Sequence, residues 1–176
     1  MGVLFVIHRY HDRIPRIDPT AFIAPGAQIA GDVEIGPEAS VWFNAVVRGD
    51  SDRVRVGART NVQDVTVLHT DPGMPCDVGD DCTIGHGAIV HGCRIGRGCL
   101  IGMGAIVLSG AVIGDESLVA AGALIPEGKE FAPRSLLVGA PARLVRTMTD
   151  DEVEDLIKPG VEHYLEYRLG YEQTPD

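Results

Sequence analysis

Three of the chain's six histidines, His69, His86 and His91, fall within 23 consecutive positions. Histidine is the commonest metal ligand among side chains, and a zinc ion bound by three of them keeps a fourth position for a water molecule. Such an ion lowers the pKa of that water to about 7 and so provides hydroxide at neutral pH. The segment therefore predicts a catalytic metal site if the fold brings the three side chains together.

The elements that must position these histidines are short repeats. Aliphatic residues recur every six positions, with a small or β-branched residue two positions earlier, as at Ile95, Ile101, Val107, Ile113, Val119 and Ile125. Six residues fit one short strand and one corner of a triangular solenoid, so that three repeats make a coil of about 18 residues. We therefore expect an all-β solenoid over residues 1–139.

The repeat also fixes which histidines are neighbours. His69 and His91 are 22 positions apart, which is one coil plus the four extra residues at Pro72–Pro75, so they should stack at one corner about 4.8 Å apart. His86 falls one face away from them. Because one chain offers two ligands at one corner and the third at another, we expect a homotrimer with the ion between chains. The same registration is absent from the other histidines, His8, His11 and His163.

A helical segment is expected after the repeats end at Val138-Gly139-Ala140-Pro141, giving a second unit over residues 140–176. Thr149-Asp150-Asp151-Glu152 is a capping-box pattern that predicts the start of a helix. Pro159-Gly160 predicts a kink, or two helices that share one face. The apolar stripe expected to pack on the solenoid contains Val153, Leu156, Ile157, Val161, Tyr164, Leu165 and Leu169.

Composition and charge exclude several classes of partner. The formal net charge is −10, which argues against nucleic acid as a partner. Neither a signal peptide nor a run of 18 apolar residues is present, which predicts a cytoplasmic protein without a membrane partner. In that compartment cysteines stay reduced, and we expect core thiols at Cys76, Cys82, Cys93 and Cys99.

Six segments along the chain form a specific combination: VVRGD (46–50), NVQD (61–64), VLH (67–69), IGHGAIVHGC (84–93), IGMGAIVL (101–108) and VAAGALI (119–125). Through these segments the chain resembles the γ-class carbonic anhydrases, over nearly its whole length. The resemblance implies a left-handed parallel β-helix and a trimer in which His69 and His91 come from one subunit and His86 from its neighbour. It also implies Zn²⁺, or Fe²⁺ or Co²⁺ in its place, and reversible hydration of carbon dioxide to bicarbonate by a metal-bound hydroxide.

Further site residues follow from the same resemblance, one position at a time. Gln63 matches a glutamine that hydrogen-bonds the metal-bound solvent, and Asn61 matches the asparagine beside it. Arg48 and Asp50 match a pair that bridges subunits near the site, although such a pair is also compatible with an ordinary structural ion pair. Tyr164 matches a C-terminal tyrosine near the pocket.

The chain departs from the family pattern where a proton would leave the site. Ser51-Asp52 stands where a glutamate is expected, and the loop Thr70–Pro75 has no acidic insertion. Weak carbonic anhydrase activity is therefore expected. Two alternatives stay open: an acyl-CoA thioesterase or acyltransferase that uses a free histidine as general base, and a non-catalytic trimeric scaffold clamped by the metal.

Overall fold

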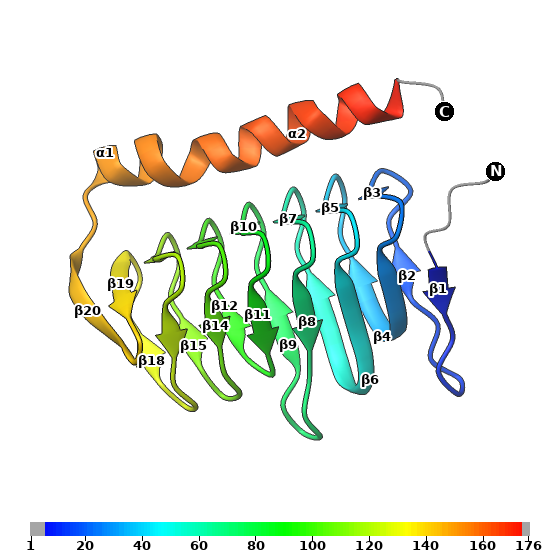
Figure 1. Ribbon diagram of the computed structural model, residues 1–176, viewed down its shortest axis with the longest axis horizontal. Helices are drawn as coiled ribbons and strands as arrows, with labels where there is room; N and C mark the ends of the chain where they lie inside the picture. Colours follow the sequence, from blue (N-terminus) through cyan, green and yellow to red (C-terminus); the bar gives the residue numbers. More distant parts are fainter. Residues whose placement is uncertain (1–5, 174–176) are drawn as a thin grey trace.

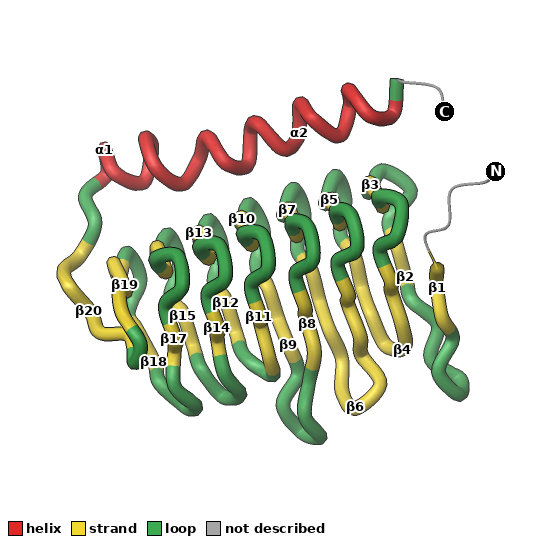
Figure 2. Tube along the Cα trace, viewed as in Figure 1, coloured by secondary structure: helices red, strands yellow, loops and turns green. Residues whose placement is uncertain are grey.

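The computed structural model describes residues 6–173, which form a parallel β-solenoid with a long helix beside it (Figure 1). The solenoid has about seven turns, in which short strands alternate with tight loops (Figure 2). Successive strands pair in parallel and in the register that the six-residue period requires; for example, His91 lies opposite His69. The predicted fold, a parallel β-helix of hexapeptide repeats with a C-terminal helix, is confirmed.

One face of the solenoid is an eight-stranded sheet on the side of the helix. Its strands are β3 (Phe22–Ile23), β5 (Ser40–Val41), β7 (Asn61–Val62), β10 (Thr83–Ile84), β13 (Leu100–Ile101), β16 (Leu118–Val119), β19 (Ser135–Gly139) and β20 (Ala142–Thr147). β20 pairs antiparallel with β19, so the sheet continues beyond Gly139 before the helix begins.

The other two faces belong to one 12-stranded sheet, because two long strands bend around the corner between them. These are β4 (Gln28–Ile35) and β6 (Val46–Val56). The second face contains β1 (Val6–His8), β8 (Val67–His69), β11 (Ile89–His91), β14 (Ile106–Val107) and β17 (Leu124–Ile125). The third contains β2 (Arg16–Ile17), β9 (Cys76–Val78), β12 (Arg94–Ile95), β15 (Val112–Ile113) and β18 (Glu130–Phe131).

The aliphatic residues of the repeat point inward and form one continuous core. Columns such as Val62, Ile84 and Ile101 are completely buried, which accounts for the period of six because each face contributes one such side chain per turn. All four cysteines are free and buried, as expected for core thiols.

The C-terminal helix is continuous from α1 (Asp150–Glu152) through a π-helical turn, η1 (Val153–Ile157), to α2 (Lys158–Glu172). The predicted capping box is confirmed, since Thr149 and Glu152 bond each other's backbone N–H groups. At Pro159, where we expected a kink or two helices, the π-helical turn immediately precedes α2, and Lys158 N–H bonds to the carbonyl five residues back, at Val153. Among the described residues, no helix is both long and apolar enough to cross a bilayer.

The buried face of the helix differs from the predicted stripe. Val153, Ile157 and Val161 are buried as expected, but Leu156 and Leu169 are 52% and 44% exposed. The π-helical turn adds one residue to a helical turn and so shifts the later positions that face the sheet. Arg168 is buried there instead and donates to the carbonyl of Thr20.

The helix is fixed along the solenoid by a second, smaller apolar cluster. Met148, Val153 and Ile157 pack on leucines of β13, β16 and β19. Gly160 permits a close approach, because a Cβ atom there would lie 2.9 Å from Thr83 Oγ1. This packing places the first turn of α2 over β10, which carries Thr83, and the second half of α2 over β5 and β3.

Candidate metal centre

His69 and His91 stand at the same corner of successive turns, where β8 and β11 end. Their ring centroids are 5.0 Å apart, and His69 Nδ1 lies 3.0 Å from His91 Nε2. The two side chains are 16% and 26% exposed, so both nitrogens are partly shielded from water. The spacing argument for this pair is therefore confirmed by the strand register.

The other ring nitrogen of each histidine has an acceptor that fixes where its proton lies. His69 Nε2 is 2.9 Å from Asp50 Oδ1, so it must carry the hydrogen that this carboxylate accepts. His91 Nδ1 is 3.0 Å from Ser109 Oγ, whose hydroxyl donates to Asp71 Oδ2 at 2.8 Å. In their neutral forms, both histidines therefore present unprotonated nitrogens to each other.

These two facing lone pairs are the feature that fits a metal ion. Two hydrogen-bond acceptors 3.0 Å apart repel each other unless a cation lies between or beside them. Nitrogens that bind one zinc ion tetrahedrally at 2.0–2.1 Å lie about 3.3 Å apart, close to the separation found here. Acidic partners on the outer nitrogens are also the usual support of metal-binding histidines.

Asp50 links the pair to Arg48. Arg48 forms a salt bridge with Asp50 Oδ2, while Oδ1 accepts from His69. Burial opposes the charged form of Asp50, but the hydrogen bonds from His69 and Arg48 outweigh it and hold the pKa of the carboxyl below its usual range. Within one chain, the Arg48–Asp50 pair therefore holds a predicted ligand; its predicted role between subunits stays a prediction.

His86 stands at a different corner, between the helix-covered face and the second face. Its Nδ1 is 2.9 Å from Asp64 Oδ2, so the hydrogen lies on Nδ1 and Nε2 keeps its lone pair. Tyr164 of α2 places its hydroxyl 3.3 Å from that Nε2. Burial, then the negative charge of Asp64 and nearby Tyr167, raise the pKa of Tyr164 to about 12, so it remains a neutral donor.

Gln63 and Asn61 support the His86 corner from beneath. Gln63 Oε1 accepts the backbone N–H of His86 at 3.2 Å, and its Nε2 donates to Asn61 Oδ1 at 3.0 Å. Asn61 in turn donates to Thr83 Oγ1 at 3.0 Å. Both amides are buried, and these bonds fix the backbone that carries His86; the predicted contact of Gln63 with solvent on the metal stays a prediction.

The predicted site residues thus form two groups within one chain. Arg48, Asp50, His69 and His91 lie at one corner, and the others, Asn61, Gln63, His86 and Tyr164, lie at the next. Within residues 6–173 no group of three or more His, Cys, Asp or Glu side chains is placed to hold an ion. A site with three histidines would therefore need a second copy of the chain, as the spacing suggested.

Two supporting residues were not identified from the sequence. Ser109 bonds to His91 and lies 18 positions after it, so the coil length alone would have placed it beside that histidine. Asp71 lies two positions after His69, in the loop that we described as lacking an acidic insertion. Its turn with Met74 brings the carboxylate back toward Ser109, which spacing could not reveal.

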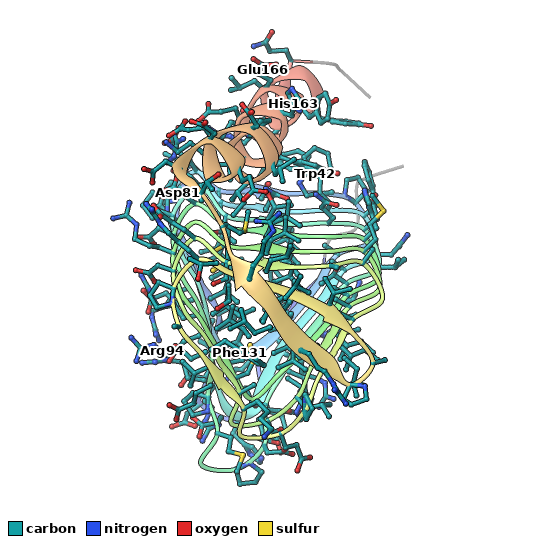
Figure 3. The ribbon with its side chains drawn as sticks, turned by 90° about the vertical axis from the view of Figure 1, so that its left-hand side faces the viewer. Trp42, Asp81, Arg94, Phe131, His163 and Glu166 are labelled. Carbon is teal, nitrogen blue, oxygen red and sulfur yellow. The ribbon has the colours of Figure 1, made fainter. Side chains whose placement is uncertain are left out.

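The face between the two corners is apolar on its outer side. Its outward column, read along the strand register, begins with the polar Gln28 and is apolar from there on, with Val46, Val67, Ile89, Ile106 and Leu124. The equivalent column on the third face contains Arg16, Glu34, Arg55, Asp77, Arg94, Val112 and Glu130. Viewed along the solenoid, Arg94 projects from this charged face and the helix covers another (Figure 3). Only the face that separates the two histidine groups is apolar and uncovered in the described part of the chain.

Comparisons with known proteins identify the same family as the sequence motifs do. The bacterial transferase hexapeptide model of six repeats matches residues 92–127. A carbonic anhydrase of Geobacillus kaustophilus is 42% identical over 151 residues, which cover 86% of this chain and 83% of that protein. Gamma carbonic anhydrase 2 of Arabidopsis thaliana mitochondria is 37% identical over 148 residues, 81% of this chain but 53% of the relative, so the chain spans about half the length of that protein.

A solved structure extends the likeness to three dimensions. The crystal structure of a hexapeptide transferase family protein from Anaplasma phagocytophilum is 42% identical, covers 94% of this chain and 98% of its own, and superposes with a TM-score of 0.89. The repeats, the paired histidines and the identity to carbonic anhydrases over most of both chains lead to one conclusion: the chain belongs to the γ-carbonic anhydrase family of hexapeptide-repeat proteins.

Proposed function

We propose that the protein is a metalloenzyme that reversibly hydrates carbon dioxide to bicarbonate. The observation that carries the proposal is the 3.0 Å approach of His69 Nδ1 to His91 Nε2, two nitrogens that each lack a hydrogen in the neutral ring. His86 of a second copy would complete a set of three neutral imidazoles. When bound there, Zn²⁺, or Fe²⁺ or Co²⁺, supplies a Lewis acid that makes water nucleophilic near neutral pH.

The apolar second face supports a homotrimer as the working assembly. It is flanked by His86 on one side and by His69 and His91 on the other, so a subunit packed against it brings unlike corners together. Val65, Ile89 and Met103, on or beside this face, are 57%, 38% and 62% exposed in the single chain. Covering these side chains would favour association, because burial of apolar surface is its main driving force.

The chain's own residues hold the ligands in place. Asp50, Asp64 and the Asp71–Ser109 pair each accept a histidine hydrogen and so keep the opposite nitrogen free to bind an ion. Tyr164 is a neutral donor that, in the single chain, lies near the nitrogen left free on His86. Because the glutamate expected after VVRGD is replaced by Ser51-Asp52, we expect proton release to be slow and turnover to be low.

Metal analysis of anaerobically purified protein, together with a carbon dioxide hydration assay, tests this proposal. We expect about one ion per trimer interface, and loss of both metal and hydration in His91→Ala. His163→Ala is the matched control, because that histidine lies on the exposed side of α2. A full complement of metal without hydration would contradict the enzymatic proposal and favour the metal-clamped scaffold.

Acyl transfer from coenzyme A is the second candidate. It is favoured by the transferase name of the Anaplasma phagocytophilum structure and by the Asp50–His69 pair, whose free Nδ1 would be available as a general base if no ion were bound. Chelation separates the two functions. Hydration should disappear when the metal is removed, whereas base catalysis by His69 should persist.

A further inference from the structure

A pocket lined almost entirely by aromatic rings lies beside the His86 corner and shares Asp64 and Tyr164 with it. It has a volume of about 360 Å³, within the range of small-molecule sites. It lies where the last turns of α2 cross the loop that follows β5, and Trp42 is seen there between helix and solenoid (Figure 3). Its lining residues are Trp42, Phe43, Asp64, Tyr164, Tyr167 and Tyr171.

The rings of this pocket are inclined steeply to one another. Trp42 makes interplanar angles of 83° with Tyr164 and 75° with Tyr171, at centroid distances of 5.0 and 5.6 Å. Tyr167 lies at 73° to Tyr164, and Phe43 at 67° to Tyr171. Walls at such angles do not form one flat platform for a nucleobase or sugar ring. These rings pack edge to face against one another, so a rounded group on the open side of the pocket would contact the edges and faces of more than one ring.

The charge of the pocket is negative. Asp64 is its one ionisable carboxylate, and neither Lys nor Arg is among the described residues that line it. Asp64 accepts hydrogen bonds from the ring of His86 and from the Phe43 N–H. Within residues 6–173 it forms no salt bridge with Lys or Arg, so no such cation neutralises its negative charge. The net charge of −10 for the chain also favours a cationic ligand over an anionic one.

We propose that this pocket binds a small quaternary ammonium compound, with the methylated ammonium group among the rings and Asp64 as its counter-charge. A cation over aromatic faces is attracted by the negative charge of the ring faces, and sets of such rings are the usual recognition element for quaternary ammonium. Trp42 is only 4% exposed, whereas Tyr167 and Tyr171 are 54% and 52% exposed, so these two tyrosine rings are the ones most accessible to a ligand. The site includes none of the predicted metal ligands, although Asp64 also accepts from His86, so binding is tested directly and by varying Tyr167 rather than through catalysis.

Fluorescence provides a direct test, because Trp42 is the only tryptophan of the chain. The full-length protein is titrated with choline and, separately, with 3,3-dimethyl-1-butanol, which has the same shape but no charge. At constant ionic strength we expect a saturable change with choline and at least a tenfold weaker response to the alcohol. Equal responses to both compounds, or none to either, would overturn the proposal.

Three variants locate the binding. Tyr167→Leu should weaken choline binding by about tenfold, and Tyr167→Phe, which keeps the ring, should restore it. Tyr10→Leu is the matched control, since Tyr10 is a comparably exposed tyrosine of the N-terminal hairpin, and it should bind as the wild type does. Unchanged binding in Tyr167→Leu would exclude this pocket, and weaker binding in Tyr167→Phe would exclude ring contact as the cause.

Discussion

At the residue scale, the three predicted ligands share one arrangement: each neutral histidine donates a hydrogen from one nitrogen to an acceptor and has no hydrogen on the other nitrogen. His69 and His86 have a direct aspartate partner, and His91 reaches Asp71 through Ser109. His8, by contrast, faces an amide oxygen of Gln28. The acidic partners therefore distinguish the candidate ligands from an ordinary surface histidine.

Removing Ser109 tests whether these partners matter. Ser109→Ala should lower metal affinity by roughly 10- to 100-fold, because His91 loses the acceptor that keeps its hydrogen on Nδ1. Competition with a chelator of known affinity measures the change. Ser51→Ala, at an exposed serine, is the control and should bind metal normally. Equal affinity in both variants would mean that Ser109 does not support the ligand.

Spacing predicted the histidine pair because a coil of constant length converts sequence distance into strand register. It could not predict the full set of partners. The carboxylate of Asp71 reaches Ser109 only because the loop after His69 turns back on itself, and the Tyr164–His86 contact depends on where a helix 78 positions away docks. Contacts of this kind follow from tertiary packing and leave no periodic signal.

At the scale of elements, the C-terminal helix is where the buried residues differ most from those that the sequence periodicity predicts. The regular 3.6-residue period placed Leu156 and Ile157 on one stripe, but the π-helical turn separates them, so that Ile157 is buried and Leu156 is exposed. Pro159, which has no N–H to donate, follows this turn directly. Pro159-Gly160 predicted that the helix is irregular at this position, but not that the irregularity is a π-helical turn.

The two neighbouring side chains give a matched pair of stability measurements. Ile157→Ala should lower the free energy of unfolding by about 2–5 kcal/mol, because it leaves a cavity against the leucines of the sheet. Leu156→Ala should change it by no more than about 0.5 kcal/mol. Urea unfolding followed by circular dichroism measures both. Similar losses in the two variants would contradict the register described for the helix.

The start of the helix should also respond to acid. Hydrogen bonds from Arg146, then from the Thr149 backbone, lower the pKa of Glu152 from 4.5 to about 2. Because the pKa is lower in the folded chain, the stabilisation is complete above pH 4.5 and is lost as the pH falls toward 2. An NMR titration of the Thr149 amide should show a midpoint near 2 that is absent in Glu152→Gln. A midpoint near 4.5 would contradict the pairing.

At the scale of the whole molecule, the three faces of the solenoid have different characters. One is covered by the helix, one is charged, and the apolar one lies between the two groups of candidate ligands. The hexad pattern predicted inward and outward positions equally well on all three faces. Which outward column is covered by the helix depended on where the C-terminal segment docks, and this was not predictable from the period alone.

A charge placed on the apolar face should separate the subunits. Ile106→Lys should yield a monomer near 18.8 kDa that binds metal poorly, because a lysine in an apolar interface must be desolvated without a partner. Val112→Lys, an equally half-buried position on the charged face, should stay trimeric. Light scattering measures the mass of each variant, and metal analysis measures the metal that it binds. A trimeric Ile106→Lys protein would exclude this face as the interface.

The central claim is that the metal site is completed by a second copy of the chain, and mixing two defective variants tests it most directly. His69→Ala removes one of the paired ligands, and His86→Ala removes the ligand lent to the neighbour. Each alone should lack whole sites. When the two variants are refolded together in equal amounts, we expect roughly a quarter of the wild-type number of metal sites. A whole site needs a His86→Ala chain, which supplies the paired ligands, next to a His69→Ala chain, which supplies His86. Mixed trimers that recover no metal binding would contradict the claim.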